Sequence, residues 1–219
     1  MEAIFFKTTG WREQPGEPPH RIWHNDIGDG LGLYYFGIAP DIPAPLESID
    51  QLRQSYRLGL AEDNAGLVEL TAIQLDTIPA LKLIAKVAQG PHGMTYLGSF
   101  TIPRRDFSYV LKVQCREYGI TGLREAVVFA QELERGHVHI SKIGQDSRLI
   151  NWDADPYEPT FAGPVLRNVA DDERYDSQFP NHPLSRVRRY LNELESTVTI
   201  ADAVKHSAAF LSPSRDADE

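Results

Sequence analysis

The chain has 219 residues, 42% of them hydrophobic and 24% charged, a composition that fits one globular domain with a real core. Its formal net charge of −9 argues against nucleic acid and against an anionic membrane surface as partners, because both are bound through clustered Lys and Arg. A single cysteine excludes an intrachain disulfide.

The compartment expected from these features is a bacterial-type cytoplasm. The N-terminus has no basic segment followed by an apolar one, so a signal peptide is not expected. No apolar run approaches the roughly 18 to 20 residues that span a bilayer.

The first third of the chain is predicted to contain short strands. Residues 3–7 indicate a strand, and residues 10–19 a polar, proline-bearing loop. Residues 21–24 and 31–36 indicate a hairpin, because the Asn, Asp and Gly residues between them tolerate positive φ.

A helix is predicted to begin at Ser48. Its distance of three residues from Gln51 predicts a capping box, in which each side chain satisfies a free backbone amide. An apolar stripe follows at helical spacing, made of Ile49, Leu52, Tyr56 and Leu60.

Four strand-like runs then follow in succession, joined by short turns. Short turns force each strand antiparallel to the previous one, since a parallel return needs a crossover of about a dozen residues or more. The runs are residues 66–75, 79–87, 93–102 and 107–115.

Two further helices are predicted. Residues 121–135 carry a stripe of Leu123, Val127, Ala130 and Leu133, and Gly136 suits a left-handed C-cap. Residues 183–198 carry the most regular stripe, with Asn181 or His182 as the cap and Pro183 in the first turn. Arg186, Arg188 and Arg189 are expected on the other faces of that helix.

This order of elements resembles the α/β/α sandwich of the PsbP-like superfamily, which includes photosystem II PsbP, a Ran-binding nuclear-import factor and bacterial DcrB-like proteins. The resemblance rests on element order, on Ile78-Pro-Ala-Leu and on Phe107-Ser-Tyr-Val-Leu-Lys-Val. It implies an α+β fold in which helices flank an antiparallel sheet. The family's roles are varied, so the resemblance supplies no catalytic residue.

We therefore expect a single sandwich domain over residues 1–200, including an inserted segment at about 118–181 before the last helix. Residues 201–219 are expected to be a C-terminal extension with a disordered tail.

Few residues carry chemical signals. Cys115 shares the apolar face of its strand with Tyr109, Leu111 and Val113, while Val110, Lys112, Gln114 and Arg116 share the other face, so a buried and inert thiol is expected. His92 lies in a Gly-Pro-His-Gly turn, where binding residues occur, although a polar turn residue explains it equally simply.

A metal site is one hypothesis for the insertion. His137 and His139 would point to the same side of an extended segment, and Asp146, Asp153 or Asp155 could add ligands. Two surface histidines are the simpler interpretation, because the spacing matches no known zinc signature. The acids of residues 171–176 lack the glycine of a calcium loop and are expected to be a solvated acidic loop.

Aromatic residues in the insertion are the candidate partner-binding residues. Trp152, Tyr157, Phe161 and Tyr175 lie in polar, proline-rich sequence, as interface anchors often do. They could equally attach a long loop to the sheet, as could Trp11 and Trp23.

The sequence favours a non-enzymatic accessory module, such as a chaperone, adaptor or immunity-type protein, that binds another protein through its sheet face or the insertion. No nucleophile elbow, phosphate loop or zinc-protease motif occurs, and no cofactor is expected. A small-ligand carrier and a metal-dependent hydrolase using His137 and His139 are the alternatives. The oligomeric state stays open.

Overall fold

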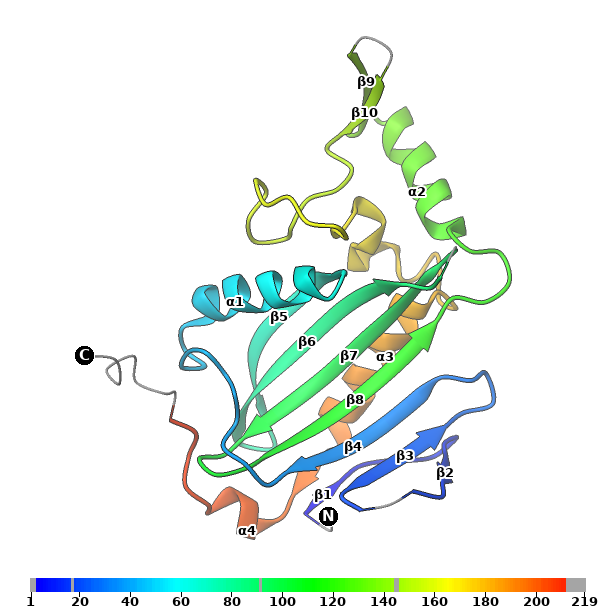
Figure 1. Cartoon of the computed structure of the whole chain (residues 1–219). Coiled ribbons are helices and arrows are strands. Elements are labelled where there is room, and N and C mark those ends of the chain that lie inside the picture. Colours follow the sequence, from blue (N-terminus) through cyan, green and yellow to red (C-terminus); the bar gives the residue numbers. More distant parts are fainter. Residues whose placement is uncertain (1–2, 17, 91, 144–145, 212–219) are drawn as a thin grey trace, which may run out of the picture.

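An antiparallel sheet of seven strands forms the centre of the molecule, in the order β2-β3-β4-β8-β7-β6-β5 (Figure 1). This computed structural model describes residues 3–16, 18–90, 92–143 and 146–211. The strands are β2 (Arg12–Gln14), β3 (His20–His24), β4 (Gly30–Phe36), β5 (Ala65–Leu75), β6 (Ile78–Ala88), β7 (Met94–Pro103) and β8 (Ser108–Arg116).

The predicted meander and hairpin are both confirmed, and β4 joins them by pairing with β8. One expectation near the N-terminus was wrong, and the strand expected over residues 3–7 is present as β1. The supposed loop contains β2, an exposed and polar edge strand without an apolar pattern to reveal it. The first strand, β1 (Ile4–Phe5), pairs with β11 (Thr199–Ile200) and not with the large sheet.

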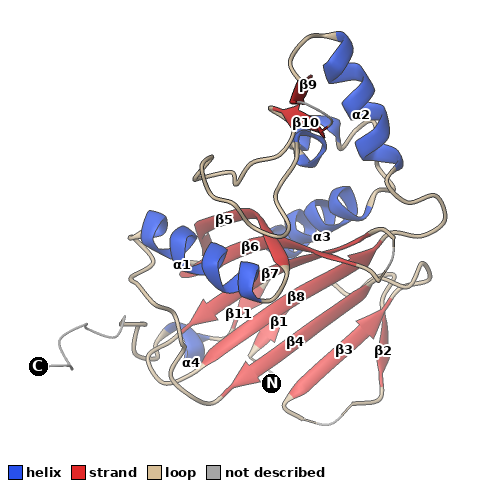
Figure 2. Ribbon diagram, turned by 45° about the horizontal axis from the view of Figure 1, so that its top comes forward, coloured by secondary structure: helices blue, strands red, loops and turns tan. Residues whose placement is uncertain are grey.

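Helices cover the sheet on its two faces, so the predicted α+β class is confirmed (Figure 2). Helix α3 (Pro183–Thr197) packs on β7 and β8, where Val187 and Leu191 lie against Gly98. Helix α1 (Ile49–Glu62) packs on β5. Leu52 of α1 also belongs to a buried cluster with Leu81 of β6. None of the described helices lies over the same face of β8, β4 and β3 (Figure 1).

The helix starts differ in how they are capped. His182 caps α3 by accepting a hydrogen bond from the Leu184 amide, which decides between the two predicted residues. Ser48 does precede α1, but its side chain makes no capping hydrogen bond, so the predicted capping box was wrong.

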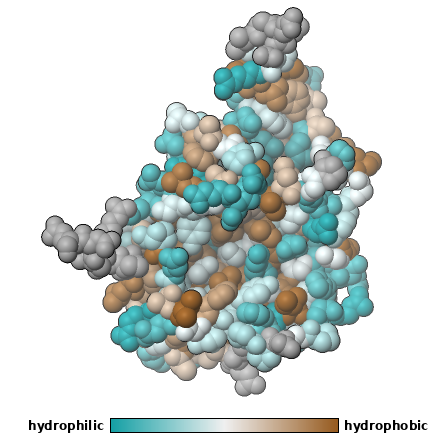
Figure 3. Space-filling view, viewed as in Figure 1, coloured by the Kyte–Doolittle hydropathy of each residue, from teal (hydrophilic) through white to brown (hydrophobic). Residues whose placement is uncertain are grey.

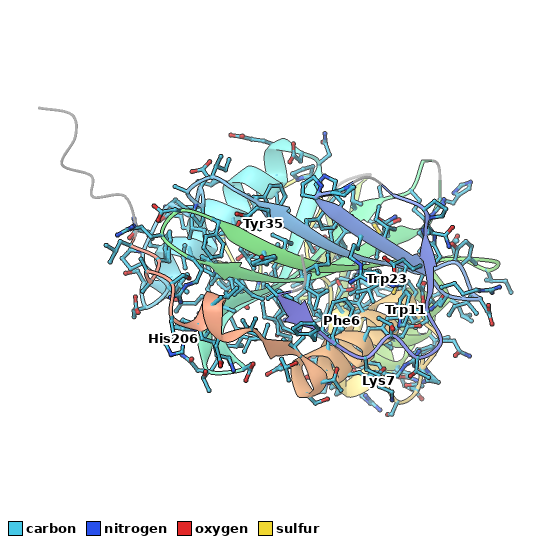
Figure 4. All side chains as sticks on the ribbon, turned by 90° about the horizontal axis from the view of Figure 1, so that it is seen from below. Phe6, Lys7, Trp11, Trp23, Tyr35 and His206 are labelled. Atoms are coloured by element: carbon cyan, nitrogen blue, oxygen red, sulfur yellow. The ribbon has the colours of Figure 1, made fainter. Side chains whose placement is uncertain are left out.

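The N-terminal segment packs against α3 and against strand β3 of the sheet (Figure 4). The Phe6 ring meets Trp23 edge-on at 5.4 Å, and Trp11 meets Tyr190 on α3 at 5.1 Å. Lys7 adds an ion pair to Glu193 of α3. Trp11 and Trp23 therefore belong to the packing between this segment, the sheet and α3.

An arm, here residues 118–150, projects from one end of the sheet (Figure 1). It consists of α2 (Leu123–Glu134) and a separate hairpin of β9 (His139–Ile143) and β10 (Asp146–Ile150). Gly136 has φ of +72°, as the predicted left-handed C-cap requires. The chain returns through two short 3-10 helices, η1 (Val169–Asp171) and η2 (Glu173–Tyr175).

After β11 the chain forms α4 (Asp202–Lys205), and the tail expected to be disordered, 212–219, lies outside the described residues. Among the helices that the structure describes, none combines the length and the apolar character needed to cross a bilayer.

Candidate functional site

Helix α2 turns its apolar stripe toward solvent. Leu123 and Leu133 are 51% and 38% exposed, and Ala126 and Ala130 are also exposed. The buried face instead carries Arg124, Val128 and Glu132, each at most 1% exposed. Of the predicted stripe, Leu123, Ala130 and Leu133 are thus exposed, and Val127 is half-buried.

Arg124 explains this orientation at one end of the helix. Its guanidinium pairs with the Asp176 carboxylate at 2.8 Å and donates to the backbone oxygens of Ala170 and Asp172. A buried charge is tolerated only when such partners surround it, so these contacts determine which side of α2 faces inward.

Glu132 explains the orientation of α2 at the other end of the helix. Its carboxylate accepts a 2.8 Å contact from His137 and a 2.5 Å contact from Arg135, and Arg174 lies 3.6 Å away. These contacts, led by His137, lower the pKa of Glu132 to about 2. The charged residues of the buried face are thus paired, and the apolar residues Leu123 and Leu133 stay partly exposed to solvent.

The exposed apolar surface continues beyond the helix. Tyr118 and Ile120, just before α2, are 55% and 79% exposed. In the hairpin, Ile140 and Leu149 are directly paired across the strands and are both exposed. Figure 3 shows brown, hydrophobic surface on this arm. We call Tyr118, Ile120, Leu123, Ala126, Ala130 and Leu133 the arm stripe.

A cleft of about 330 Å³ lies at the base of the arm, between the start of α2 and the start of α3. Ile120 and Leu123 of the arm stripe line it, together with Phe179. Glu117 and His182 also line it, so the cleft combines apolar walls with a polar part.

That polar part is a cluster of two carboxylates and an imidazole. His182 Nε2 lies 3.6 Å from Glu117 Oε1 and 3.7 Å from Glu125 Oε1. Both distances exceed a hydrogen bond, and within the described residues neither His182 Nε2 nor Glu125 Oε2 has a hydrogen-bond partner. In the part of the chain that the structure describes, this cluster is the group whose spacing could hold a cation.

The tautomer of His182 decides whether its Nε2 can bind a cation. Because His182 Nδ1 accepts the Leu184 amide proton at 3.3 Å, a neutral ring carries its own proton on Nε2. Nε2 then points a hydrogen at the carboxylates and has no free lone pair for a metal. In this tautomer, His182 therefore offers the cluster no free nitrogen as a metal ligand.

The two carboxylates have different environments. Burial raises the pKa of Glu117, but His182 and the amides of Gly122 and Met94 outweigh burial and leave this pKa below its ordinary value. Burial also dominates at Glu125 and raises its pKa. The pKa values of the two carboxyl groups are therefore shifted in opposite directions.

The four aromatic residues singled out in the insertion all contact the body. Tyr157 exchanges two hydrogen bonds with the Leu70 backbone, and Arg53 lies 3.9 Å above its ring. Phe161 lies under Arg57, Trp152 meets Phe129 edge-on, and Tyr175 is buried. These contacts are those of residues that attach the insertion to the sheet and to α2.

The three histidines singled out in the sequence have different surroundings. His137 is exposed and bound to Glu132, His139 is exposed at the start of β9, and His92 is exposed in the β6–β7 turn. Of the aspartates proposed with them, Asp155 is buried against Arg57, and Asp153 forms a backbone bridge to Asn168. Strand β10 begins at Asp146, whose side chain lies outside the description.

Two predictions about burial had opposite outcomes. Cys115 is buried as expected, and burial raises the pKa of its thiol, so the thiolate is disfavoured. The acids of residues 171–176 are not a solvated loop: Asp171 is fully buried against Lys86, and Asp176 binds Arg124 and Arg188. Arg186 and Arg188 are likewise buried in ion pairs.

The sequence matches no protein-family model and no curated protein. Among solved structures it is similar to cyanobacterial PsbP (CyanoP) from Synechocystis, at 10% identity and a TM-score of 0.33 over 60% of this chain and 88% of that one. A PsbP protein is therefore among the solved structures to which this chain is similar.

Two other solved structures are similar. A Bacteroides thetaiotaomicron protein matches at 8% identity and a TM-score of 0.33 over 54% of this chain, and the match spans 43% of its own length. LpqN of Mycobacterium tuberculosis, involved in cell envelope biogenesis, matches at 13% identity and a TM-score of 0.26 over 67% of this chain and 82% of that one.

Proposed function

We propose that this protein is a non-enzymatic accessory module that binds an amphipathic helix of a partner protein on the arm stripe. The observation that supports this proposal is the orientation of α2, whose charged face is buried and whose apolar face is exposed. An apolar helix face without a partner is a usual feature of a helix-binding surface.

The geometry of the stripe favours a helix as the occupant. Leu123, Ala126, Ala130 and Leu133 follow one another at intervals of three or four residues, which forms a ridge along α2. Two small alanines between two leucines allow another helix to approach closely. The cleft beside Leu123 can receive one larger apolar side chain of that helix.

Charge favours a different protein over a second copy of this chain. Each copy carries a net charge of −9, so two copies repel one another at long range. A partner helix with basic flanks is attracted instead. We further propose a bacterial-type cytoplasm as the compartment, since the fold uses no disulfide.

Site-specific photocrosslinking tests this proposal in the cells that make the protein. A photoreactive residue at Ala130 should crosslink to one partner, and the crosslinked peptide should be an amphipathic helix with basic flanks. The matched control is the same residue at Leu58, which is 49% exposed on α1. Leu123→Asp should abolish the Ala130 crosslink while Leu58→Asp leaves it intact.

Three results would contradict the proposal. These are crosslinks at Ala130 no more selective than those at Leu58, a crosslink to a second copy of the chain, or a partner that Leu123→Asp does not release. Thermal unfolding of Leu123→Asp serves as the folding control, and little change is expected because Leu123 is exposed.

A further inference from the structure

The helix-free face of β3, β4 and β8 contains a trough. Across these strands, His24, Gly30 and Gln114 form one row of paired residues, and Ile22, Gly32 and Lys112 form the next. The two glycines have no side chains, so the surface of the sheet is lower along β4 than along β3 and β8. The resulting hollow measures about 320 Å³ and is also lined by Tyr34, Arg116 and Tyr118.

The two glycines differ in what they provide. A Cβ on Gly32 would lie 2.5 Å from the Tyr34 ring, so the absence of a side chain lets this ring fold over β4 as one wall of the trough. A Cβ on Gly30 would meet nothing closer than 3.8 Å. The space above Gly30 is therefore open and not required by the packing.

The charges in the trough are positive and lack carboxylate partners. Lys112 makes no ion pair with any residue that the structure describes, and Arg116 binds only the neutral Gln89 side chain and lies 5.9 Å from the Tyr118 ring. On this face of β3, β4, β7 and β8, no described residue is acidic. In a chain with 31 acidic and 22 basic residues, two cations on one face of the same strand without a carboxylate partner are unexpected.

We propose that the trough binds a small anionic ligand whose carboxylate or phosphate group lies between Lys112 and Arg116. The body of the ligand lies over Gly30 against the Tyr34 ring, and Gln114 supplies a further polar contact. The volume of about 320 Å³ is at the lower end of small-molecule sites, about 300 to 1,000 Å³, so the ligand is small.

This site is independent of the arm stripe. The trough lies on the sheet, whereas the stripe lies mainly on α2, and Tyr118 is the residue that borders both. A failure of helix binding therefore leaves the trough proposal unaffected, and the reverse also holds.

NMR titrations of the full chain with inorganic phosphate and with citrate, at constant ionic strength, test the proposal. We expect saturable shifts of the Gly30 and Gly32 amides with at least one anion, and no such shifts with chloride. A stronger response to phosphate identifies a phosphate site, and a stronger response to citrate identifies a carboxylate site.

Three variants sharpen the titration. Lys112→Met should weaken binding about tenfold or more, the range for a lost charge-assisted hydrogen bond. Gly30→Ala, which fills part of the trough without a clash, should also weaken binding. Arg105→Met removes an exposed charge in the β7–β8 turn and should bind like the wild-type chain.

Equal shifts in the Lys112 and Arg105 variants would overturn the proposal, because the response would then reflect general charge alone. Shifts that never saturate, or that chloride reproduces, would overturn it as well. If Lys112→Met does not fold, unchanged binding by Gly30→Ala is sufficient to reject the site.

Discussion

Lys86 Nζ lies 2.5 Å from Asp171 Oδ2, and both side chains are at most 2% exposed. The pair joins β6 to η1, two segments 85 residues apart. Asp171 also accepts hydrogen bonds from the Tyr96 hydroxyl and the Asn168 amide. The returning chain of the insertion is thus attached to the centre of the sheet, and Arg124 of α2 is in turn attached to that returning chain.

Removing one partner of this pair should be costly. Lys86→Met leaves a buried carboxylate without its cation, and we expect a loss of about 3 to 5 kcal/mol in the free energy of unfolding. The pKa of Asp171, now below its ordinary value despite burial because of Lys86 and its hydrogen bonds, should rise. Urea unfolding measures the first effect.

The double variant Lys86→Met/Asp171→Asn is the control for this prediction. It removes the charge that the single variant leaves unpaired, so it should be more stable than Lys86→Met alone. A double variant as unstable as the sum of the two single variants would show that the ion pair is not what couples these segments.

The strand register could be read from the sequence, and the position of the insertion could not. Alternation in residues 107–115 assigns Leu111 and Val113 to one face and Lys112 to the other, and the structure has both assignments. A period-2 pattern needs only neighbouring residues. The inward face of α2, by contrast, depends on Arg124 meeting Asp176, and no local pattern reveals that partner.

The same reason explains why buried charges were missed. Lys86, Asp171 and Arg186 look like surface residues in sequence, because charged residues are rarely buried unless paired. One cue for the burial of Lys86 did exist. This residue lies in an apolar strand, β6, that has buried residues on both faces. Part of the trough was visible in the sequence, since Gly30 ends the predicted turn and Gly32 follows two residues later in the predicted strand.

Close packing of α3 on the sheet predicts a specific interaction between two substitutions. Leu191→Ala should cost about 2 to 5 kcal/mol, because Leu191 is fully buried. Gly98→Ala should cost about 1 to 3 kcal/mol, because a Cβ there would lie 2.6 Å from Val187 and 2.8 Å from Leu191.

Together, Leu191→Ala and Gly98→Ala should be less destabilising than their sum, since the first opens space that the second partly fills. Chemical denaturation of the four proteins in this cycle measures the coupling. A loss below about 0.5 kcal/mol for Leu191→Ala, as at surface positions, would contradict the packing described.

The Tyr157 hydroxyl should stabilise the edge strand β5. The hydroxyl accepts the Leu70 amide at 2.9 Å and donates to the Leu70 carbonyl, and β5 is the last strand of the sheet. Tyr157→Phe keeps the ring under Arg53 and leaves the Leu70 amide unpaired, a cost of about 1 to 3 kcal/mol. The Leu70 carbonyl keeps its 3.2 Å hydrogen bond from Arg53 Nε.

Hydrogen exchange locates this effect. We expect faster exchange of the Leu70 amide in Tyr157→Phe and unchanged exchange in β8, the middle strand of the sheet. Unchanged protection at Leu70 together with a lost partner crosslink would instead assign Tyr157 to partner binding, as the sequence also allowed.

Glu125 should make stability depend on pH with a definite sign. Burial raises its folded-state pKa above the ordinary value of 4.5, so the folded protein holds this proton more tightly than the unfolded chain does. Below about pH 4.5 both states are protonated and nothing is lost. As the pH rises through the raised pKa, the charged form destabilises the folded state.

Glu125→Gln, which stays neutral, should therefore be more stable than the wild-type chain at neutral pH, and the advantage should shrink as the pH falls toward 4.5. Glu117→Gln should behave in the opposite way, because its lowered pKa stabilises the charged form above pH 4.5 and two backbone amides depend on it. Melting temperatures from pH 4 to 8 measure both. If Glu125→Gln lowered stability at neutral pH, the charged carboxylate would be the form that the cleft stabilises, and the division of roles between Glu117 and Glu125 would be wrong.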